Sequence, residues 1–318
     1  SPNLYLSSLQ EQVAQELAGS YDYLAFFCNS GAEANEAAIK LARKATGKQG
    51  IITFQQSFHG RTFGAMAATG QDKIKEGFGD GVPHFSYAAY NDLASVEDLV
   101  NQDTAAIMLE LVQGESGVRP AEASFVKVLA DFCQREGILL IVDEVQTGMG
   151  RTGQLYSFEH YGIIPDIVTL AKGLANGLPA GALLGKSRLA SALGPGSHGS
   201  TFGGNKLAMA AALETLHIMK EMGFLEEVRS KSAILLEQLQ LAFQDHPKIS
   251  AVRGLGMMIG IETSASLSKI VEGARQKGLI ILTAGENVIR LLPPLTISRE
   301  EIQQGITVLK EVFSEVDE

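Results

Sequence analysis

The sequence predicts an α/β protein with a mainly parallel sheet, helices on both faces of that sheet, and a smaller α+β domain at the C-terminal end. Short apolar runs alternate with amphipathic helical patterns along the part of the chain that precedes Gly203, which is typical of a parallel sheet with helical connections. The apolar runs are nearly continuous rather than alternating, which favours strands covered by helices on both faces.

The predicted strands are short apolar runs that give way to polar or glycine-containing segments. In chain order they cover 24–28, 51–54, 105–110, 138–143, 166–170 and 181–185. Helical patterns lie between them at 9–18, 32–45 and 125–136, with a less clear one at 96–100. Because ligands collect beyond the carboxyl ends of parallel strands, the polar residues that follow these runs are the candidates for chemistry.

The pattern changes after Gly203 and Gly204. A long helical pattern extends from Lys206 to about residue 244 and is interrupted near Gly223. A strand-like run at 256–262, a helix at 267–277 and an apolar run at 279–282 follow. We interpret this as a linker helix leading into the smaller domain, with a large domain at 1–214 and a small domain at 215–318.

Composition restricts the partners and the compartment. A chain of 318 residues exceeds the usual size of one domain, and its net charge of −10 argues against a nucleic-acid partner. No apolar run approaches membrane-spanning length, so we expect no membrane partner and a cytoplasmic location. Cys28 and Cys133 lie in apolar stretches, which predicts buried thiols; two cysteines with no matching histidine cluster predict no metal site.

A possible anion site follows the first predicted strand. Ser30 and Gly31 stand where a strand gives way to a helix, so free backbone N–H groups and the helix dipole would meet a phosphate there. The alternative is a plain capping box, because Ser30 is followed three residues later by Glu33.

An acid and an amine follow two later strands. Asp143 ends a buried run, where a carboxylate needs a cation or several donors, and a protonated heterocyclic nitrogen would serve. Lys172 stands where the next run meets a glycine-containing loop, and in a pocket it could trap a carbonyl and then act as a base. Taken separately, a structural acid and a surface lysine remain the alternatives.

The segment from Gly148 to Gly153 matches the G-x-G-x-x-G spacing of dinucleotide sites. That fingerprint should open a helix directly after a strand, whereas here four residues intervene and no convincing helix follows. We therefore reject an NAD site.

Seven motifs occur in this chain in the order that one enzyme family shows. They are Asn29-Ser-Gly-Ala-Glu-Ala-Asn-Glu36, Phe58-His-Gly-Arg-Thr62, Gln113-Gly-Glu-Ser-Gly117, Asp143-Glu-Val-Gln-Thr-Gly-Met-Gly-Arg-Thr-Gly153, Leu170-Ala-Lys-Gly173, Gly199-Ser-Thr-Phe-Gly-Gly-Asn205 and Arg290-Leu-Leu-Pro-Pro294. Through them the chain resembles the class III, ornithine-type aminotransferases over essentially its whole length. The resemblance implies fold type I of the pyridoxal-phosphate enzymes, with pyridoxal 5'-phosphate as cofactor and a homodimer with shared active sites.

The resemblance also assigns roles to the cofactor-binding residues. Lys172 would bind the cofactor aldehyde covalently, and Asp143 would keep the ring nitrogen protonated. The remaining contacts would come from Ser30, Gly31 and Ala32 at the phosphate, from Thr201 of the neighbouring subunit at the same phosphate, from Phe58 or His59 stacked on the ring, and from Gln146 at the phenolic oxygen.

Arg61 and Arg290 correspond to the carboxylate-binding arginines of the family. A guanidinium binds a carboxylate through paired charge-assisted hydrogen bonds, so two arginines suit glutamate and one suits a donor with one carboxylate. Glu115 would pair with Arg290 when no dicarboxylate is bound; a solvated loop acid is the alternative for Glu115.

The resemblance implies transamination of N-acetylornithine with 2-oxoglutarate, giving N-acetylglutamate 5-semialdehyde and glutamate in arginine biosynthesis. Phe58-His-Gly-Arg61 and Leu282-Thr-Ala-Gly285 are similar to the subgroup with that specificity. Ornithine, 4-aminobutyrate, succinylornithine and the acetylated diamine of lysine synthesis remain alternative donors, and a non-catalytic binding protein is the alternative of another class. The family has a further segment before the residue that matches Ser1, so we expect some substrate contacts to lie outside this sequence.

Overall fold

A computed structural model describes residue 5 and residues 7–317 of the chain. The chain divides into two compact units, each with its own core. Unit 1 comprises Ser1–Leu111, Ala121–Met149 and Tyr156–Glu221, and unit 2 comprises Val112–Pro120, Gly150–Leu155 and Met222–Glu318.

Unit 1 contains a seven-stranded sheet. Its order is β1 (Tyr23–Cys28), β9 (Gly181–Lys186), β8 (Ile167–Leu170), β7 (Leu139–Asp143), β4 (Thr104–Leu109), β2 (Gly50–Phe54) and β3 (Phe85–Ala88). Only β9 runs antiparallel to its neighbours among these described strands, and the other pairs are parallel. β1 and β8 are therefore parallel to each other, and their carboxyl ends lie at one edge of the sheet together with that of β7.

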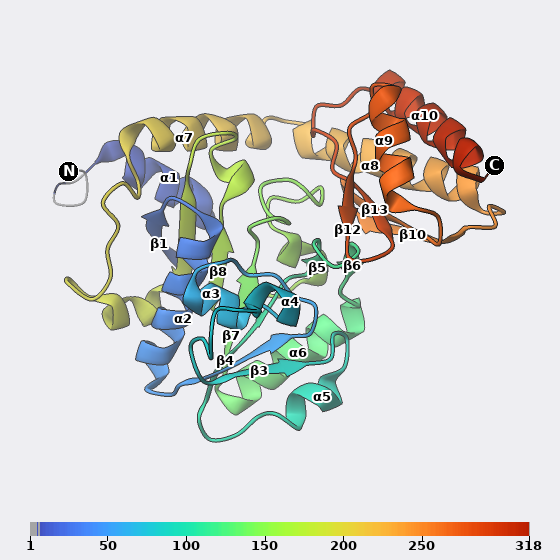
Figure 1. Ribbon diagram of the computed structural model, residues 1–318. Coiled ribbons are helices and arrows are strands. Elements are labelled where there is room, and N and C mark those ends of the chain that lie inside the picture. The colour runs from blue at the N-terminus through green and yellow to red at the C-terminus, as the bar shows by residue number, and fades with distance from the viewer. Residues whose placement is uncertain (1–4, 6, 318) are drawn as a thin grey trace. The chain divides into compact units, whose positions relative to one another are not determined.

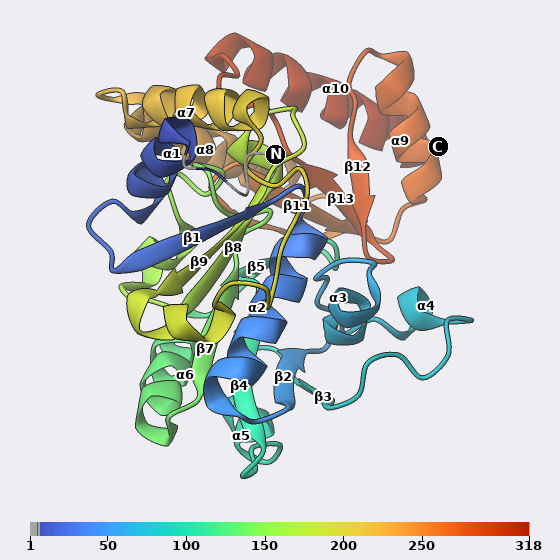
Figure 2. The ribbon, with the colours of Figure 1, turned by 90° about the vertical axis from the view of Figure 1, so that its left-hand side faces the viewer.

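Helices cover both faces of this sheet. Figures 1 and 2 show α2 on one face and α6 on the other. The α-helices of unit 1 are α1 (Ser8–Ala18), α2 (Gly31–Thr46), α3 (Phe63–Ala68), α4 (Asp72–Lys75), α5 (Leu93–Glu97), α6 (Ala123–Glu136) and α7 (Lys206–Lys220), and the 3-10 turns are η2 (Ser157–Tyr161), η3 (Lys172–Leu174) and η4 (Ser187–Leu193).

Helix α2 packs closely on the sheet because its inner face is small. Ala34, Ala38 and Leu41 are buried at the three- and four-residue spacing of one helical face. The helix ends at Gly47, whose φ of 72° is left-handed and suits glycine. The compact inner face brings the first turn of α2 close to the ends of the strands.

Unit 2 is an antiparallel sheet with helices on one face. The four-stranded sheet has the order β10 (Ile249–Leu255), β11 (Met258–Thr263), β13 (Val288–Leu291) and β12 (Leu282–Ala284), and β5 (Val112–Gln113) pairs with β6 (Arg119–Pro120). Its helices are α8 (Phe224–Phe243), α9 (Leu267–Gln276) and α10 (Arg299–Asp317).

The two faces of the unit 2 sheet differ in chemistry. Ile259, Ile261 and Ile289 pack with apolar residues of α8, α9 and α10 in one core cluster. Because side chains alternate along a strand, Gly260 and Arg290 point to the opposite face. The charged strand residues Arg253, Glu262 and Arg290 share that opposite face.

The expected fold class is confirmed, including the two-sided helical cover and the α+β nature of the second unit. The large-domain boundary expected near Thr215 falls inside α7, whereas unit 1 extends to Glu221. The short segments 112–120 and 150–155 also belong to unit 2, and no sequence pattern indicated that.

Several elements were not predicted. β3, β10, α3 and α10 have no counterpart among the predicted elements, and the pattern at 96–100 forms α5 a few residues earlier. The interruption near Gly223 is confirmed, because Gly223 has a φ of 90° and precedes α8. The segment from Gly148 to Gly153 forms turns and opens no helix, as expected.

Candidate active site

Asp143 and Lys172 come from the same edge of the unit 1 sheet. Asp143 is the last residue of β7 and is the register partner of Thr169 on β8. Lys172 follows β8 and begins the turn η3. Because parallel strands present their carboxyl ends at one edge, the acid and the amine that the sequence singled out both belong to that edge.

The carboxylate of Asp143 is buried and accepts three hydrogen bonds. Its Oδ2 accepts from Nδ1 of His59 and from Nδ2 of Asn35, both at 2.8 Å. Its Oδ1 accepts from the backbone N–H of Val145 at 2.9 Å. These donors offset the desolvation of the carboxylate and fix its orientation.

Asn35 connects Asp143 to the neighbouring strand. Its side chain lies on α2 and is 1% exposed. Its Oδ1 accepts from the hydroxyl of Thr169 at 2.7 Å, and its Nδ2 donates to the carbonyl of His59 at 2.7 Å. One amide therefore ties together α2, β7, β8 and the loop that carries His59.

The loop with Phe58 and His59 is held by side-chain acceptors. The N–H of Phe58 donates to Oε2 of Glu110 at 2.9 Å, and that of His59 donates to the hydroxyl of Thr69 at 2.9 Å. The imidazole of His59 is buried, and its Nε2 has no hydrogen-bond partner among the described residues. The imidazole of His59 therefore contacts Asp143 through Nδ1. The side chain of Phe58 is only half-buried.

Arg61 lies on the exposed part of the same loop. Its Cζ is 5.9 Å from the centroid of the Phe58 ring. Glu36 fixes the start of helix α3. Its Oε1 accepts from the hydroxyl of Thr62 at 2.6 Å and from the N–H of Gly64 at 2.8 Å. The loop is therefore anchored on both sides of Arg61.

The N-terminus of α2 lies at the same sheet edge, because it follows β1. Ser30 is the N-cap and accepts the N–H of Glu33 at 3.2 Å. The capping box, which was the alternative interpretation, is only half formed: the Glu33 carboxylate accepts instead from the N–H of Asn29 at 2.7 Å. The first-turn N–H groups of Gly31 and Ala32 have no partner within the helix, so cap and anion site are compatible.

Gly31 allows α2 to approach the turn after β7. A Cβ at this position would lie 2.7 Å from Cγ1 of Val145, which no real Cβ tolerates without movement. The glycine therefore brings the helix N-terminus next to the turn that begins at Asp143.

Lys172 has an uncommon backbone conformation. Its φ is 44°, in the left-handed region that a residue with a Cβ seldom occupies. Such strain persists where the surroundings hold it in place, and it gathers at functional sites. The side chain of Lys172 is exposed.

Two further predicted cofactor residues lie in segments near this edge. Gln146 is half-buried in the turn after β7. Thr201 is exposed, and its neighbour Ser200 accepts from Nδ2 of Asn29 at 3.0 Å. The 199–205 segment is therefore held against the start of α2 in its own chain.

The predicted pair of Glu115 and Arg290 forms within unit 2. Nη1 of Arg290 donates to Oε1 of Glu115 at 2.8 Å and to the carbonyl of Gly114 at 2.9 Å. Arg290 is 7% exposed, and its Nε has no hydrogen-bond partner among the residues that the structure describes. A buried guanidinium with a spare donor is suited to a further anionic group.

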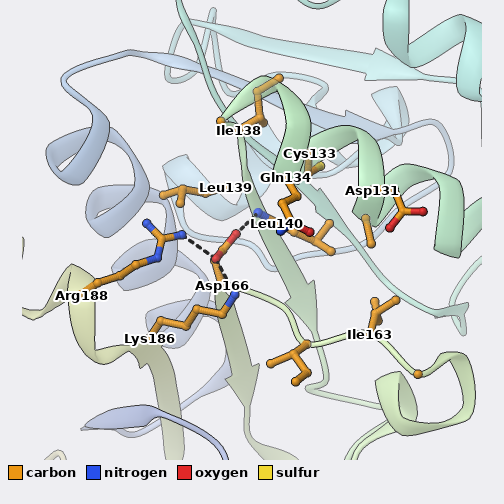
Figure 3. A pocket seen from close by; sticks show the side chains of 14 residues that line it. Asp131, Cys133, Gln134, Ile138, Leu139, Leu140, Ile163, Asp166, Lys186 and Arg188 are labelled. Carbon is orange, nitrogen blue, oxygen red and sulfur yellow. Dashed lines mark hydrogen bonds and ion pairs between the residues drawn. The ribbon is translucent and has the colours of Figure 1, made fainter.

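A separate cavity of about 560 Å³ lies at the opposite edge of the unit 1 sheet (Figure 3). Leu139 begins β7 there, and Asp166 immediately precedes β8. Oδ1 of Asp166 accepts from Nζ of Lys186 at 2.9 Å and from Nη2 of Arg188 at 2.7 Å. The cavity holds neither Asp143 nor Lys172, so it is not the predicted site.

Sequence reasoning missed the residues that hold the site. Asn35 and Glu36 lie inside the first motif, three and four residues after Ala32, and that helical spacing could have indicated one face. Thr169 and Glu110 lie in or directly after apolar strands, where a polar residue needs a partner. Their partners lie far away in sequence, which no local pattern gives.

Comparison with known proteins identifies the family. The family model described as aminotransferase class-III matches residues 2–313. Acetylornithine aminotransferase of Streptococcus mutans is 68% identical over 315 residues, covering 99% of this chain and 83% of that protein. The same-named protein of Listeria monocytogenes is 57% identical, covering 98% and 81%. The ornithine aminotransferase structure from Toxoplasma gondii superposes with a TM-score of 0.94 at 29% identity, covering 99% of this chain and 78% of that one.

The chain belongs to the class-III aminotransferases. The expected family and reaction type are thereby confirmed. Within the described residues, no helix is long and apolar enough to cross a membrane, and no group of three or more His, Cys, Asp or Glu side chains could hold a metal ion.

Proposed function

We propose that this chain is an acetylornithine aminotransferase of arginine biosynthesis. It would transfer the amine of N-acetylornithine to 2-oxoglutarate and release N-acetylglutamate 5-semialdehyde and glutamate. The observation that carries the proposal is the 68% identity to a relative of that name over nearly the whole chain. Similarity to an ornithine aminotransferase structure is much lower in sequence, at 29% identity, and favours ornithine less.

The residues at the sheet edge fit pyridoxal 5'-phosphate. The N-terminus of α2 at Ser30, Gly31 and Ala32 offers unpaired N–H groups and a positive dipole to a phosphate. The buried carboxylate of Asp143 suits a protonated ring nitrogen, and the amine of Lys172 suits an aldehyde. Anion-binding, acidic and nucleophilic groups therefore occur together in the combination that this cofactor requires.

The remaining contacts with the cofactor ring would come from Phe58 and Gln146. Phe58 would stack on the ring, because His59 is buried and donates to Asp143. Gln146 would contact the phenolic oxygen of the ring. The hydrogen bonds through Asn35 would keep the carboxylate of Asp143 in one orientation toward the ring nitrogen.

The bound cofactor supplies an electron sink for the carbon that loses its proton. The residues of the chain supply position and proton transfer. Nζ of Lys172, once released by the incoming amine, would take the proton from the substrate carbon that bears the reacting amine. Asp143, held by His59 and Asn35, would keep the ring nitrogen of the bound cofactor protonated. Proton transfer by a positioned amine contributes roughly 10²–10⁴-fold in rate.

Two arginines would bind substrate carboxylates. Arg61 is exposed on its anchored loop, and Arg290 has a spare buried donor in unit 2. Glu115 would neutralise Arg290 while a substrate with one carboxylate is bound, and would give way to the second carboxylate of glutamate or 2-oxoglutarate. This exchange would let one enzyme accept two unlike amino donors.

We further propose a homodimer in which Thr201 contacts the neighbouring subunit's phosphate site. Unit 1 exposes large apolar side chains near this segment: Phe202 and Leu207 are each 70% exposed. Contiguous exposed apolar patches are typical of protein contacts, and these two side chains would contribute to such a patch. We also propose that unit 1 is the cofactor-binding domain, that unit 2 is the small domain, and that the enzyme acts in the cytoplasm.

A donor panel with a lysine variant tests the proposed function. The highest kcat/KM should occur with N-acetylornithine, compared with ornithine, N-succinylornithine, 4-aminobutyrate and the acetylated diamine of lysine synthesis. Lys172→Ala should abolish turnover and the visible absorbance of bound cofactor, whereas Lys127→Ala, which removes an exposed lysine on α6, should change neither.

Three other results of these experiments would each reject a different part of the proposed function. A preference for another donor would keep the family chemistry and reject the proposed substrate. Full turnover by the Lys172 variant would reject the proposed mechanism. Cofactor binding without turnover of any donor would favour a non-catalytic protein.

A further inference from the structure

Two arginines flank one glycine in the central part of the unit 2 sheet. Gly260 on β11 is the register partner of Arg253 on β10 and also of Arg290 on β13. Residues directly opposite one another in adjacent strands point to the same face of a sheet. Arg253, Gly260 and Arg290 therefore form one row, on the face opposite to the helices. We call it the Arg–Gly–Arg row.

The loop that carries Glu115 lies directly over this row. A Cβ on Gly260 would be 3.1 Å from the carbonyl oxygen of Gly117 and 3.1 Å from Cβ of Val118. A Cβ at this position would press on the backbone of the loop, whereas glycine lets the loop approach the sheet closely. Gly260 thus marks the place where the loop rests on the sheet.

Each arginine of the row holds one part of the loop. Arg290 donates to the carbonyl of Gly114 and to the carboxylate of Glu115, as described above. Nη2 of Arg253 donates to the carbonyl of Gly117 at 2.9 Å, and its Nε donates to the same oxygen at 3.1 Å. The same Nε also lies 3.3 Å from the carbonyl of Val118. The segment from 114 to 118 is therefore bound at both ends by guanidinium groups.

Arg253 is itself fixed by a second pair of polar side chains. Its Nη1 donates to Oε2 of Glu262, and Oε1 of Glu262 accepts from Nδ2 of Asn287 at 3.2 Å. Glu262 is also on β11, so the support comes from the same sheet. Arg253 is thus held on one side and binds the loop with the other.

The backbone of the loop is strained where Arg253 binds it. Val118 has a φ of 50°, which is an outlier for a β-branched residue, and its side chain is fully buried with Val112 and Met258. A strained backbone persists only where its surroundings hold it. The fork of Arg253 on the carbonyls of Gly117 and Val118 is one such restraint.

We propose that Arg253 and Gly260 are positioning residues that set the balance between the two amino donors. This inference rests on the proposed function, in which Glu115 stays on Arg290 for one donor and leaves it for the other. Arg253 holds the loop in the arrangement that keeps Glu115 on Arg290. Loss of that restraint makes Arg290 more available to a second carboxylate, and it weakens the arrangement that suits a donor with one carboxylate.

Arg253→Gln tests this through the two half-reactions, each followed by the visible absorbance of the cofactor in the holoenzyme. The ratio of kcat/KM for N-acetylornithine to that for glutamate should fall about 10-fold, since couplings between a positioning group and a site lie in this range. Arg253→Lys keeps the charge and one donor but loses the fork, so it should restore part of the ratio. Arg275→Gln, the same change at an exposed ion pair of unit 2, should leave the ratio unaltered.

Two further variants separate positioning from general damage. Glu262→Gln removes the support of Arg253 without touching the loop, and Gly260→Ala pushes on the loop from below; both should shift the ratio in the same direction. In a Glu115→Ala background, Arg253→Gln should change the ratio less than about 2-fold, because its effect passes through Glu115. An equal slowing of both half-reactions, or the same shift in the Glu115→Ala background, would overturn the proposal.

A binding measurement does not depend on turnover. Glutarate, a dicarboxylate without an amine, should bind the Arg253→Gln holoenzyme about 5-fold more tightly by calorimetry, because the competent arrangement is more populated. Unchanged or weaker binding would contradict the inference. If the wild-type enzyme instead prefers another donor, the proposed substrate is rejected but the positioning role of Arg253 is not. The ratio of kcat/KM values is then measured with that donor and glutamate.

Discussion

Asp143 illustrates how a single carboxylate can be kept both buried and directed. Its two oxygens accept from three donors, and each donor belongs to a different element. Asn35 lies on α2, His59 lies in the loop before α3, and the N–H of Val145 lies in the turn after β7. Hydrogen bonds to a charged group each contribute about 1.5–3 kcal/mol, so removal of one donor is costly and misdirects the acid.

Asp143→Asn should therefore reduce turnover far more than cofactor attachment. The amide cannot hold a proton on a facing ring nitrogen as a carboxylate does, so kcat should fall roughly 10²–10⁴-fold. The visible absorbance that depends on Lys172 should persist. Asp131→Asn, an exposed change on α6, is the matched control and should leave kcat unaltered. A variant of Asp143 with wild-type kcat would exclude this residue from the mechanism.

At the scale of elements, the turn after β7 depends on the residue next to Asp143. Glu144 is buried, and its Oε1 accepts from the hydroxyl of Ser157 at 2.7 Å and from the N–H of Phe158 at 3.0 Å. Its Oε2 accepts from the hydroxyl of Thr147 at 2.6 Å. Burial raises the pKa of Glu144, and the hydrogen bonds from Thr147 and Ser157 oppose that rise.

This pKa gives a stability prediction with a definite sign. The folded protein holds the proton of Glu144 more tightly than the unfolded chain does, so the contribution to stability is full below about pH 4.5 and falls as the pH rises. Glu144→Gln removes this titration. The free energy of unfolding of the variant, relative to wild type, should rise between pH 4.5 and pH 7.

Urea unfolding across that pH range measures the difference between the two proteins. Glu97→Gln, an exposed change on α5, should show no such trend. A relative stability that stays flat or falls with pH would show that Glu144 does not carry a raised pKa.

At the scale of the whole molecule, the exposed segment around Thr201 should form a subunit contact. Phe202→Glu combined with Leu207→Glu places two charges where apolar groups should be buried, so sedimentation should show a monomer. Activity should fall with dimer content, because Thr201 would no longer reach its neighbour. Ile164→Glu, which charges another apolar residue that is 57% exposed, should leave the dimer intact. An active wild-type monomer would contradict the shared site.

The sequence predicted the elements of unit 1 better than those of unit 2. Buried parallel strands such as β7 and β8 are continuous apolar runs that stand out locally. β10 contains Arg253 and glycine and has no fully buried residue, so its pattern does not resemble a core strand. Its identity as a strand depends on pairing with β11, which is not a local property.

Local patterns and ordered motifs determined the fold class, the family and the candidates Asp143 and Lys172. Strand ends and helix starts depend on residues that are close together in the sequence, so a local pattern can indicate them. Only the tertiary structure decided which side chains support them. Asn35 reaches Asp143, and Arg253 reaches the loop of Glu115, across long separations in the chain. Such contacts arise from strand order and register, and these are fixed by packing of the whole unit rather than by any short stretch of sequence.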